Sequence, residues 1–171
     1  MGTARNLFYY LSGLGTLPEN AQFELSLEDG FLIMNYLKIK VLGRNEVVQQ
    51  YKINACDIVA LDIVNTADLK KKSMLARGAT GGILFGPVGA VLGGMSAAAQ
   101  SKIKSTLSIS YISSGNGEMK SVVFNADPPS WGGLNRSAIA KFKKVLEKAP
   151  KSAAVLEYLG QTQNADGSIT L

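Results

Sequence analysis

Hydrophobic and polar residues alternate along the first third of the chain, in the two-residue period of half-buried β-strands. Residues 22–28 show this period most clearly, because every second side chain is apolar. Asp29-Gly30 follows directly and predicts a tight hairpin turn, since both central positions of such a turn favour a positive φ. The same pattern predicts four consecutive strands, at residues 22–28, 31–41, 46–53 and 57–64.

The alternation stops after residue 64 and returns near residue 107. Two further strands are predicted there, at 107–111 and 119–125, with a Ser-Gly-Asn-Gly turn between them. The core contacts expected from the strand before the interruption are Ile58, Leu61 and Ile63.

Helical spacing replaces the alternation near the end of the sequence. An apolar stripe predicts an amphipathic helix at 137–149, with Asn135 or Ser137 as its N-terminal cap. A shorter helix is expected at 152–159, with Gly160 as its C-terminal cap and a polar tail beyond it. The stripe of the first helix consists of Ile139, Phe142, Val145 and Leu146.

The residues ahead of the first clear strand are apolar and aromatic, notably Phe8, Tyr9 and Tyr10. We expect these three side chains to anchor an N-terminal helix rather than to act as reactive groups. Three roles stay open for this segment, namely lying on a membrane, capping the sheet and binding a neighbouring protomer.

This order of elements predicts an α+β fold that is mainly β, with about six or seven antiparallel strands and a closing C-terminal helix. It resembles the pleckstrin-homology-like (PH-like) superfold in its bacterial, GRAM-like form, over residues 23–148. The resemblance rests on the order of the elements, on the strand at 57–61 and on the helix at 137–148. It implies an antiparallel β sandwich or barrel that the helix closes. The expected division is an apolar segment at 1–21, the PH-like domain at 22–149 with a Gly-rich hairpin insert at 73–100, and a short helix and tail at 150–171.

A glycine-rich segment interrupts the predicted strands. Residues 78–99 carry no charge, and small residues recur there at every fourth position. That spacing puts them on one face of a helix, where backbones can approach closely, although each glycine costs about 1 kcal/mol relative to alanine. Pro87 interrupts the segment near its centre, which favours a helical hairpin over one straight helix. The glycines expected to permit close packing are Gly78, Gly82, Gly86, Gly89 and Gly93.

This segment resembles the glycine-zipper segments of some bacterial membrane-associated proteins and the Gly-rich hairpin of certain bacterial PH-like proteins. The resemblance covers residues 71–94 and implies membrane contact or self-assembly, without a known activity. Two further explanations stay open: a buried hairpin within a soluble fold, and a dry interface between subunits. A phosphate-binding P-loop is excluded because the chain has no Gly-Lys-Ser/Thr sequence.

The net charge of +5 is concentrated in one stretch. Residues 70–104 hold six basic residues and no acidic one, whereas the rest of the chain has twelve basic and thirteen acidic residues. The protein is therefore not basic throughout, and no nucleic-acid partner is expected. Basic residues beside an apolar segment either keep it in solution or meet an anionic membrane, where each contributes about 1 kcal/mol. The residues expected to bind lipid headgroups are Lys70, Lys71, Lys72, Arg77, Lys102 and Lys104.

The composition offers little for catalysis or metal binding. The chain has no histidine and one cysteine, which excludes a histidine-based triad, a zinc site of cysteine and histidine, and an internal disulfide. Cys56 is expected to be buried and inert. Asp57 and Asp62 are expected on opposite faces of one strand, where they cannot pair. We therefore expect no enzyme, no metal and no cofactor, and we expect Trp131 to cover the core, with a membrane interface as the alternative.

Two functional hypotheses follow. The first is a non-enzymatic PH-like module that forms homo-oligomers, docks on an anionic membrane, or does both, through the glycine-rich hairpin and its basic flanks. The second is a soluble protein-interaction or scaffold domain in which the hairpin is an internal structural element. Residues 1–16 lack the pattern of a secretory signal, so we expect the protein in the cytoplasm, with docking at the inner face of the cell membrane.

Overall fold

A computed structural model of the chain describes residues 6–18, 21–40, 45–65, 103–127 and 132–165. Within these ranges the chain forms seven β-strands, one short 3-10 helix and two α-helices. The strands are β1 (Leu7–Ser12), β2 (Gln22–Glu28), β3 (Phe31–Lys38), β4 (Glu46–Asn54), β5 (Ile58–Asn65), β6 (Ser105–Ile112) and β7 (Met119–Asn125). The helices are η1 (Ala55–Asp57), α4 (Gly132–Leu146) and α5 (Ala153–Ala165). The predicted α+β class, mainly β, is confirmed.

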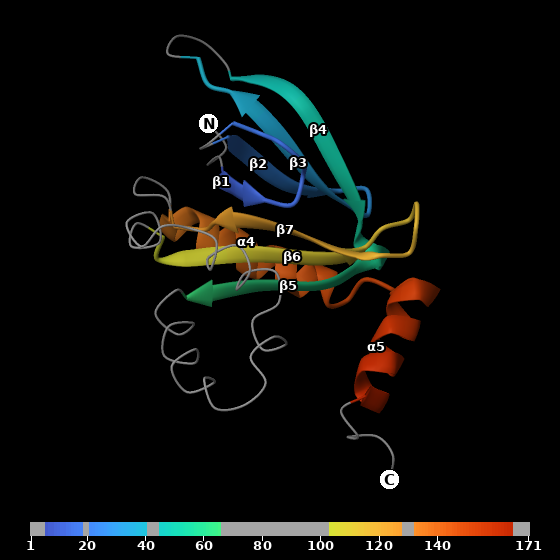
Figure 1. The fold of residues 1–171 in the computed structure, drawn as a ribbon. Coiled ribbons are helices and arrows are strands. Elements are labelled where there is room, and N and C mark those ends of the chain that lie inside the picture. The colour runs from blue at the N-terminus through green and yellow to red at the C-terminus, as the bar shows by residue number, and fades with distance from the viewer. Residues whose placement is uncertain (1–5, 19–20, 41–44, 66–102, 128–131, 166–171) are drawn as a thin grey trace, which may run out of the picture.

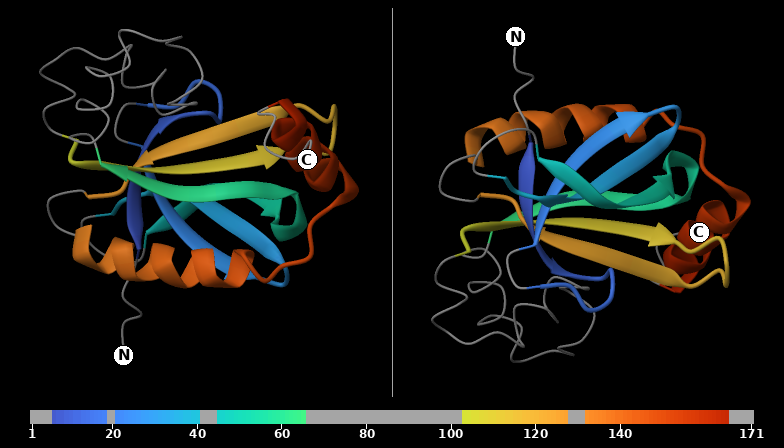
Figure 2. Two further views of the ribbon diagram at one scale, coloured as in Figure 1. Left: turned by 90° about the horizontal axis from the view of Figure 1, so that it is seen from below. Right: turned by 90° about the horizontal axis from the view of Figure 1, so that it is seen from above.

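The seven strands join one antiparallel sheet in the order β4-β3-β2-β1-β7-β6-β5. β4 and β5 lie at its two ends, so the sheet formed by the described strands is open rather than a closed barrel. It bends strongly, and β2–β4 pass across the layer formed by β5–β7 (Figure 1). α4 runs along one side of the bent sheet, whereas α5 projects from one end of it (Figures 1 and 2).

The hydrophobic core lies between the bent sheet and α4. Phe8, Phe23 and Phe124 are fully buried, and the ring centroids of Phe23 and Phe124 are 5.4 Å apart. Ile139 and Leu146 of α4 belong to the same buried cluster. Because full burial of a large apolar side chain contributes about 1.5–3 kcal/mol, these two residues hold α4 against the sheet.

The N-terminal aromatic residues form strand β1, so the predicted N-terminal helix is wrong. Phe8 and Tyr10 enter the core and alternate with less buried neighbours. β1 pairs with β2 on one side and with β7 on the other, and thereby joins the two halves of the sheet. Alternating aromatic side chains suit a pleated sheet with partners on both sides, and this tertiary pairing decides the conformation of a six-residue segment.

The hairpin predictions hold with small changes at the strand ends. The strands expected at 22–28 and 119–125 are confirmed residue for residue. Asp29 and Gly30 adopt φ values of 50° and 79°, as the predicted turn requires. The strand expected at 31–41 is shorter than predicted, because β3 ends at Lys38.

The start of β5 differs from the prediction. Asp57 belongs to η1, which Asn54 caps by accepting a hydrogen bond from Cys56 N at 3.3 Å. Asp57 and Asp62 therefore do not share a strand as expected. Ile63, predicted to be a core residue, is 38% exposed although Leu61 is buried as expected.

α4 begins at Gly132, before the predicted start, so neither Asn135 nor Ser137 is its N-terminal cap. Asn135 is fully buried inside the helix, and its Nδ2 donates to Leu7 O at 2.6 Å and to Ala126 O at 3.3 Å. A short polar side chain in the first turns of a helix can satisfy nearby main-chain groups. Here it joins α4 to β1 and to the residue that follows β7.

Two predictions about the helices are wrong at single positions. Val145 is 56% exposed, because it lies at the margin of the apolar stripe while Leu146 takes the buried position. Gly160 does not cap the second helix, since α5 continues to Ala165. A glycine within a helix costs about 1 kcal/mol relative to alanine, and the tertiary context can override this cost. The predicted insert at 73–100 and Trp131 lie outside the described residues.

Candidate functional site

The structure describes one of the predicted site residues, Lys104, which is exposed just ahead of β6. The other five basic residues and the five glycines lie outside the described residues: Lys70, Lys71, Lys72, Arg77, Lys102, Gly78, Gly82, Gly86, Gly89 and Gly93. Within the described part of the chain, no helix is long and apolar enough to span a membrane.

The chain on either side of residues 66–102 is fixed by strand pairing. Asn65, the last residue of β5, is paired with Ser105, the first residue of β6. The two described residues that flank this segment most closely in β5 and β6 are therefore neighbours in the sheet. This geometry brings the chain near Lys104 to the point where β5 ends.

A small polar cluster stands beside this point. Asp127, just after β7, accepts hydrogen bonds from Arg136 of α4, with 3.1 Å between Nε and Oδ1, and from the Ser105 hydroxyl. The hydrogen bond from the Arg136 guanidinium lowers the pKa of Asp127, and partial burial opposes this effect. The cluster holds the start of β6, the end of β7 and α4 together.

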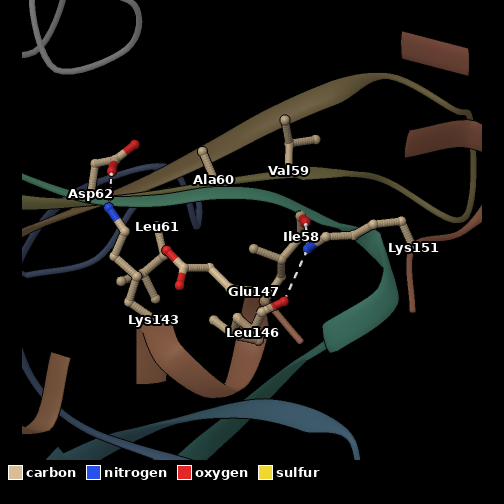
Figure 3. A pocket seen from close by; sticks show the side chains of 9 residues that line it. All are labelled: Ile58, Val59, Ala60, Leu61, Asp62, Lys143, Leu146, Glu147 and Lys151. Carbon is tan, nitrogen blue, oxygen red and sulfur yellow. Dashed lines mark hydrogen bonds and ion pairs between the residues drawn. The ribbon is translucent and has the colours of Figure 1, made fainter. Parts of the chain in front are cut away.

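A groove of about 320 Å³ lies between β5 and the C-terminal half of α4 (Figure 3). Its walls combine the first residues of an edge strand with one side of the helix and the residue after Pro150. The lining residues are Ile58, Val59, Ala60, Leu61, Asp62, Lys143, Leu146, Glu147 and Lys151. β5 is the last strand of the sheet, and β6 is its sole neighbour among the described strands. The main chain on the other edge of β5 therefore faces this groove.

Asp62 of β5 and Lys143 of α4 form an ion pair across the edge of β5 that faces the groove. Leu61 belongs to the core, so the next residue, Asp62, lies on the opposite face of the strand. Lys143 of α4 nevertheless reaches it, with 3.1 Å between Nζ and Oδ1 (Figure 3). The hydrogen bond that Lys143 donates to this carboxylate raises the pKa of Lys143. Both side chains are about half exposed, and exposed ion pairs contribute at most about 1 kcal/mol.

Lys151 closes the other end of the groove. Its Nζ donates to Ile58 O at 2.8 Å and to Leu146 O at 3.2 Å, so it bridges the first residue of β5 and the last residue of α4. Ser152 N donates to Cys56 O at 2.9 Å, which fixes the connection between α4 and α5 across the start of β5. None of the ion pairs among the described residues involves Lys151.

A second hollow, of about 450 Å³, lies near the other end of this connection. It is bounded by the β2–β3 turn on one side and the end of α4 on the other, and exposed Val145 contributes to it. No free strand edge borders this hollow in the described structure, since β2 and β3 each have partners on both sides. It offers side chains but no unpaired main chain to a ligand.

The described residues offer little for metal binding or for a reactive thiol. They contain no group of three or more side chains that could hold a metal ion. Cys56 is half-buried rather than buried as expected, and its Sγ lies 3.6 Å from Asp57 Oδ1. Partial burial and, secondarily, the negative charge of Asp57 raise the pKa of the Cys56 thiol. A thiol with a raised pKa is mostly protonated at neutral pH and is a poor nucleophile.

Sequence reasoning missed the groove and its charged residues, Lys143, Glu147 and Lys151. Their sequence signal was limited to a polar face on the predicted helix and a lysine after its terminal proline. Ile63 was wrongly predicted to be a core residue because the alternation shows which face of the sheet a side chain is on. It does not show whether the strand lies at the edge of the sheet.

Comparisons with protein-family models, with curated proteins and with solved structures found no match to the chain. The case for a function therefore depends on the geometry of the groove and of the strands around it.

Proposed function

We propose that the protein is a non-catalytic PH-like interaction module that binds an extended peptide strand in the groove between β5 and α4. Three features support the PH-like assignment: the antiparallel order of seven strands, the strong bend of the sheet, and the helix packed over its open side. Of these features, the sequence resemblance rests on the closing helix, together with the order of the elements and the strand at 57–61.

The free edge of β5 is the observation that carries the proposal. From Ala60 to Val64 the strand pairs with β6 in regular register, so its main chain is fully extended. No described strand pairs with the opposite edge, so the N–H and C=O groups there can pair with an added strand. A strand bound there would gain main-chain hydrogen bonds from β5 and side-chain contacts from α4.

The groove offers apolar surface to a bound strand, and only an exposed ion pair lies in the path of that strand. Leu146 of α4 forms part of its apolar wall, and Ile63 extends the apolar surface along β5 with 38% of its area exposed. The ion pair between Lys143 and Asp62 lies across the edge where a strand would add. Because that pair is exposed, displacing it costs little compared with the hydrogen bonds an added strand would form.

The other edge of the sheet serves as a comparison. β4 exposes Val47 and Val48, and its pairing with β3 shifts register between Tyr36 and Leu37. β5 has a register shift of its own between Ile58 and Ala60, but this shift lies at the start of the strand and leaves the pairing from Ala60 onward regular. The groove beside β5 has α4 as its second wall, and no residue of β4 lines either of the two hollows described above. β5 is therefore the better template for a bound strand.

The test is selection from a random displayed peptide library, followed by NMR mapping of the selected peptides on the labelled protein. We expect amide shifts concentrated in β5 and in the second half of α4. Ile63→Glu is expected to weaken binding by about tenfold or more, since it places a charge on the apolar edge. Val48→Glu, on the opposite edge, is the matched control and should leave affinity unchanged. Selected peptides that map to β4 or to α5, or no selection at all, would refute the proposal.

A second function, self-assembly or docking on an anionic membrane through residues 66–102, is favoured by the pairing of Asn65 with Ser105. Adjacent ends mean that residues 66–102 begin and end at one place in the sheet. They also disfavour a single crossing of a bilayer, because the charged flank would have to return through the hydrocarbon.

Light scattering, with and without detergent, and flotation with anionic liposomes test this second function. We expect discrete oligomers or salt-sensitive flotation, and we expect Gly86→Leu to reduce whichever of the two occurs while far-UV circular dichroism stays unchanged. Gly115→Leu, in the β6–β7 turn, where nothing lies within 4 Å of an added Cβ, is the control. A monomer that ignores liposomes, or a Gly86→Leu variant that behaves like wild type, removes the special role of the glycines.

A further inference from the structure

Building on the proposed strand-binding function, we propose that the groove takes the C-terminal end of a peptide chain, whose free carboxylate binds the ammonium of Lys151. The inference rests on three observations: the direction of an added strand, the closed end of the groove and the charge placed at that end.

The direction follows from the strand order. Every strand pair in the sheet is antiparallel, and antiparallel pairing is slightly more stable for each residue than parallel pairing. β5 runs from Ile58 to Asn65, so an antiparallel strand on its free edge runs toward Ile58. The C-terminal residue of this added strand then lies beside Lys151, whose Nζ donates a hydrogen bond to Ile58 O.

The groove ends at this position. Lys151 joins the start of β5 to the end of α4, and Ser152 N is bonded to Cys56 O immediately behind it. A bound strand that continued in a straight line past Ile58 would meet this connection. A chain that terminates there fits without rearrangement of the fold.

The charge at the closed end favours a carboxylate. An ammonium group carries three donors, and the two recorded contacts of Lys151 are to neutral carbonyl oxygens. One donor and the positive charge remain available on a residue that lines the groove. A carboxylate would form a charge-assisted hydrogen bond there, whereas the ammonium of a parallel strand's N-terminus would be repelled.

The remaining charged groups lie toward the other end of the groove. Glu147 extends toward Lys143 rather than toward Lys151, and it contributes to the raised pKa of Lys143 (Figure 3). Asp62 is held in its ion pair with Lys143. Neither acidic residue that lines the groove therefore compensates Lys151, and Asp57, the residue before Ile58, is not part of the lining and forms no ion pair with Lys151. The aliphatic surface at Ile63 lies upstream of the bound terminus.

Two random peptide libraries test the inference, one displayed with free carboxyl termini and one followed by a fixed C-terminal extension. We expect enrichment from the first library only. For a selected synthetic peptide, replacing the terminal carboxylate by an amide should weaken binding by about tenfold, the usual effect of losing a charge-assisted hydrogen bond. Lys151→Met should abolish the difference between acid and amide forms, while Lys143→Met, which keeps Lys151, should preserve it.

The outcomes separate the inference from the function on which it rests. Peptides that map to β5 but bind equally as acids, amides or internal sequences would overturn the role of Lys151 and leave strand binding intact. Peptides that fail to map to β5 would overturn both. If Lys151→Met unfolds the protein, the acid and amide peptides measured on wild type decide the question by themselves.

Discussion

Replacing Gly13 by alanine is expected to destabilise the protein more than the same change at Gly15, Gly30, Gly115, Gly117 or Gly160. Gly13 follows β1 directly and adopts a φ of 110°. A Cβ added there would lie 2.1 Å from Ser121 O and 2.8 Å from Val122 Cα. Both atoms belong to the main chain of β7, so a rotamer change cannot relieve the contact. Either β1 or β7 has to move, and β1 is the strand that joins the two halves of the sheet.

The expected magnitude combines two separate costs. An L-residue held at positive φ costs about 1–2 kcal/mol relative to glycine. Forcing an extra carbon into a closely packed site costs about 1–3 kcal/mol more. Gly13→Ala should therefore lower the free energy of unfolding by about 2–5 kcal/mol, a large part of the 5–15 kcal/mol typical of a domain.

Two other glycines separate these costs experimentally. Gly15 has a φ of 88° with nothing within 4 Å of an added Cβ, so Gly15→Ala should show the conformational cost alone. Gly115 has neither a positive φ nor a neighbour, so Gly115→Ala should be neutral or stabilising by up to about 1 kcal/mol. Urea denaturation followed by far-UV circular dichroism gives the three free energies by linear extrapolation. A Gly13→Ala variant within about 0.5 kcal/mol of Gly15→Ala would refute the steric argument.

Two further predictions concern the junction of α4 with the sheet. Asn135→Ala removes the side-chain amide that donates to Leu7 O and Ala126 O. It should lower the free energy of unfolding, measured by urea denaturation, by about 1–3 kcal/mol. Ser137→Ala, at an exposed position of the same helix, is the control and should have little effect. Asp127→Asn should destabilise the protein at neutral pH, and the difference in unfolding free energy from wild type should shrink on acidification. The folded-state pKa of Asp127 lies below the ordinary 3.8, because Arg136 donates a hydrogen bond to the carboxylate. The stabilisation is therefore present above about pH 4 and is lost as the pH falls through the lowered pKa. A difference that stays constant between pH 7 and pH 2, measured by urea denaturation, would contradict this assignment.

Local patterns predicted those elements whose conformation is decided by nearby residues. β2 and the turn after it follow from strict alternation and from the positive φ that Asp29 and Gly30 adopt. β7 follows from the same kind of evidence. β1 was missed because its partners are β2 and β7, and the second of these is more than a hundred residues away in the sequence. Without the central strand, the two predicted groups of strands have no fixed relation to each other.

The candidate site was out of reach for a related reason. Whether β5 is an edge strand depends on β1 standing between β2 and β7, because that arrangement pushes β4 and β5 to the two ends of the sheet. Ile63 shows the consequence at a single residue. It shares a strand face with buried Leu61, yet it is 38% exposed because no further strand lies beside β5 among the described residues. An apolar residue on the core face of a strand but open to solvent indicates a missing neighbour, and in this fold that neighbour's place is the proposed peptide groove.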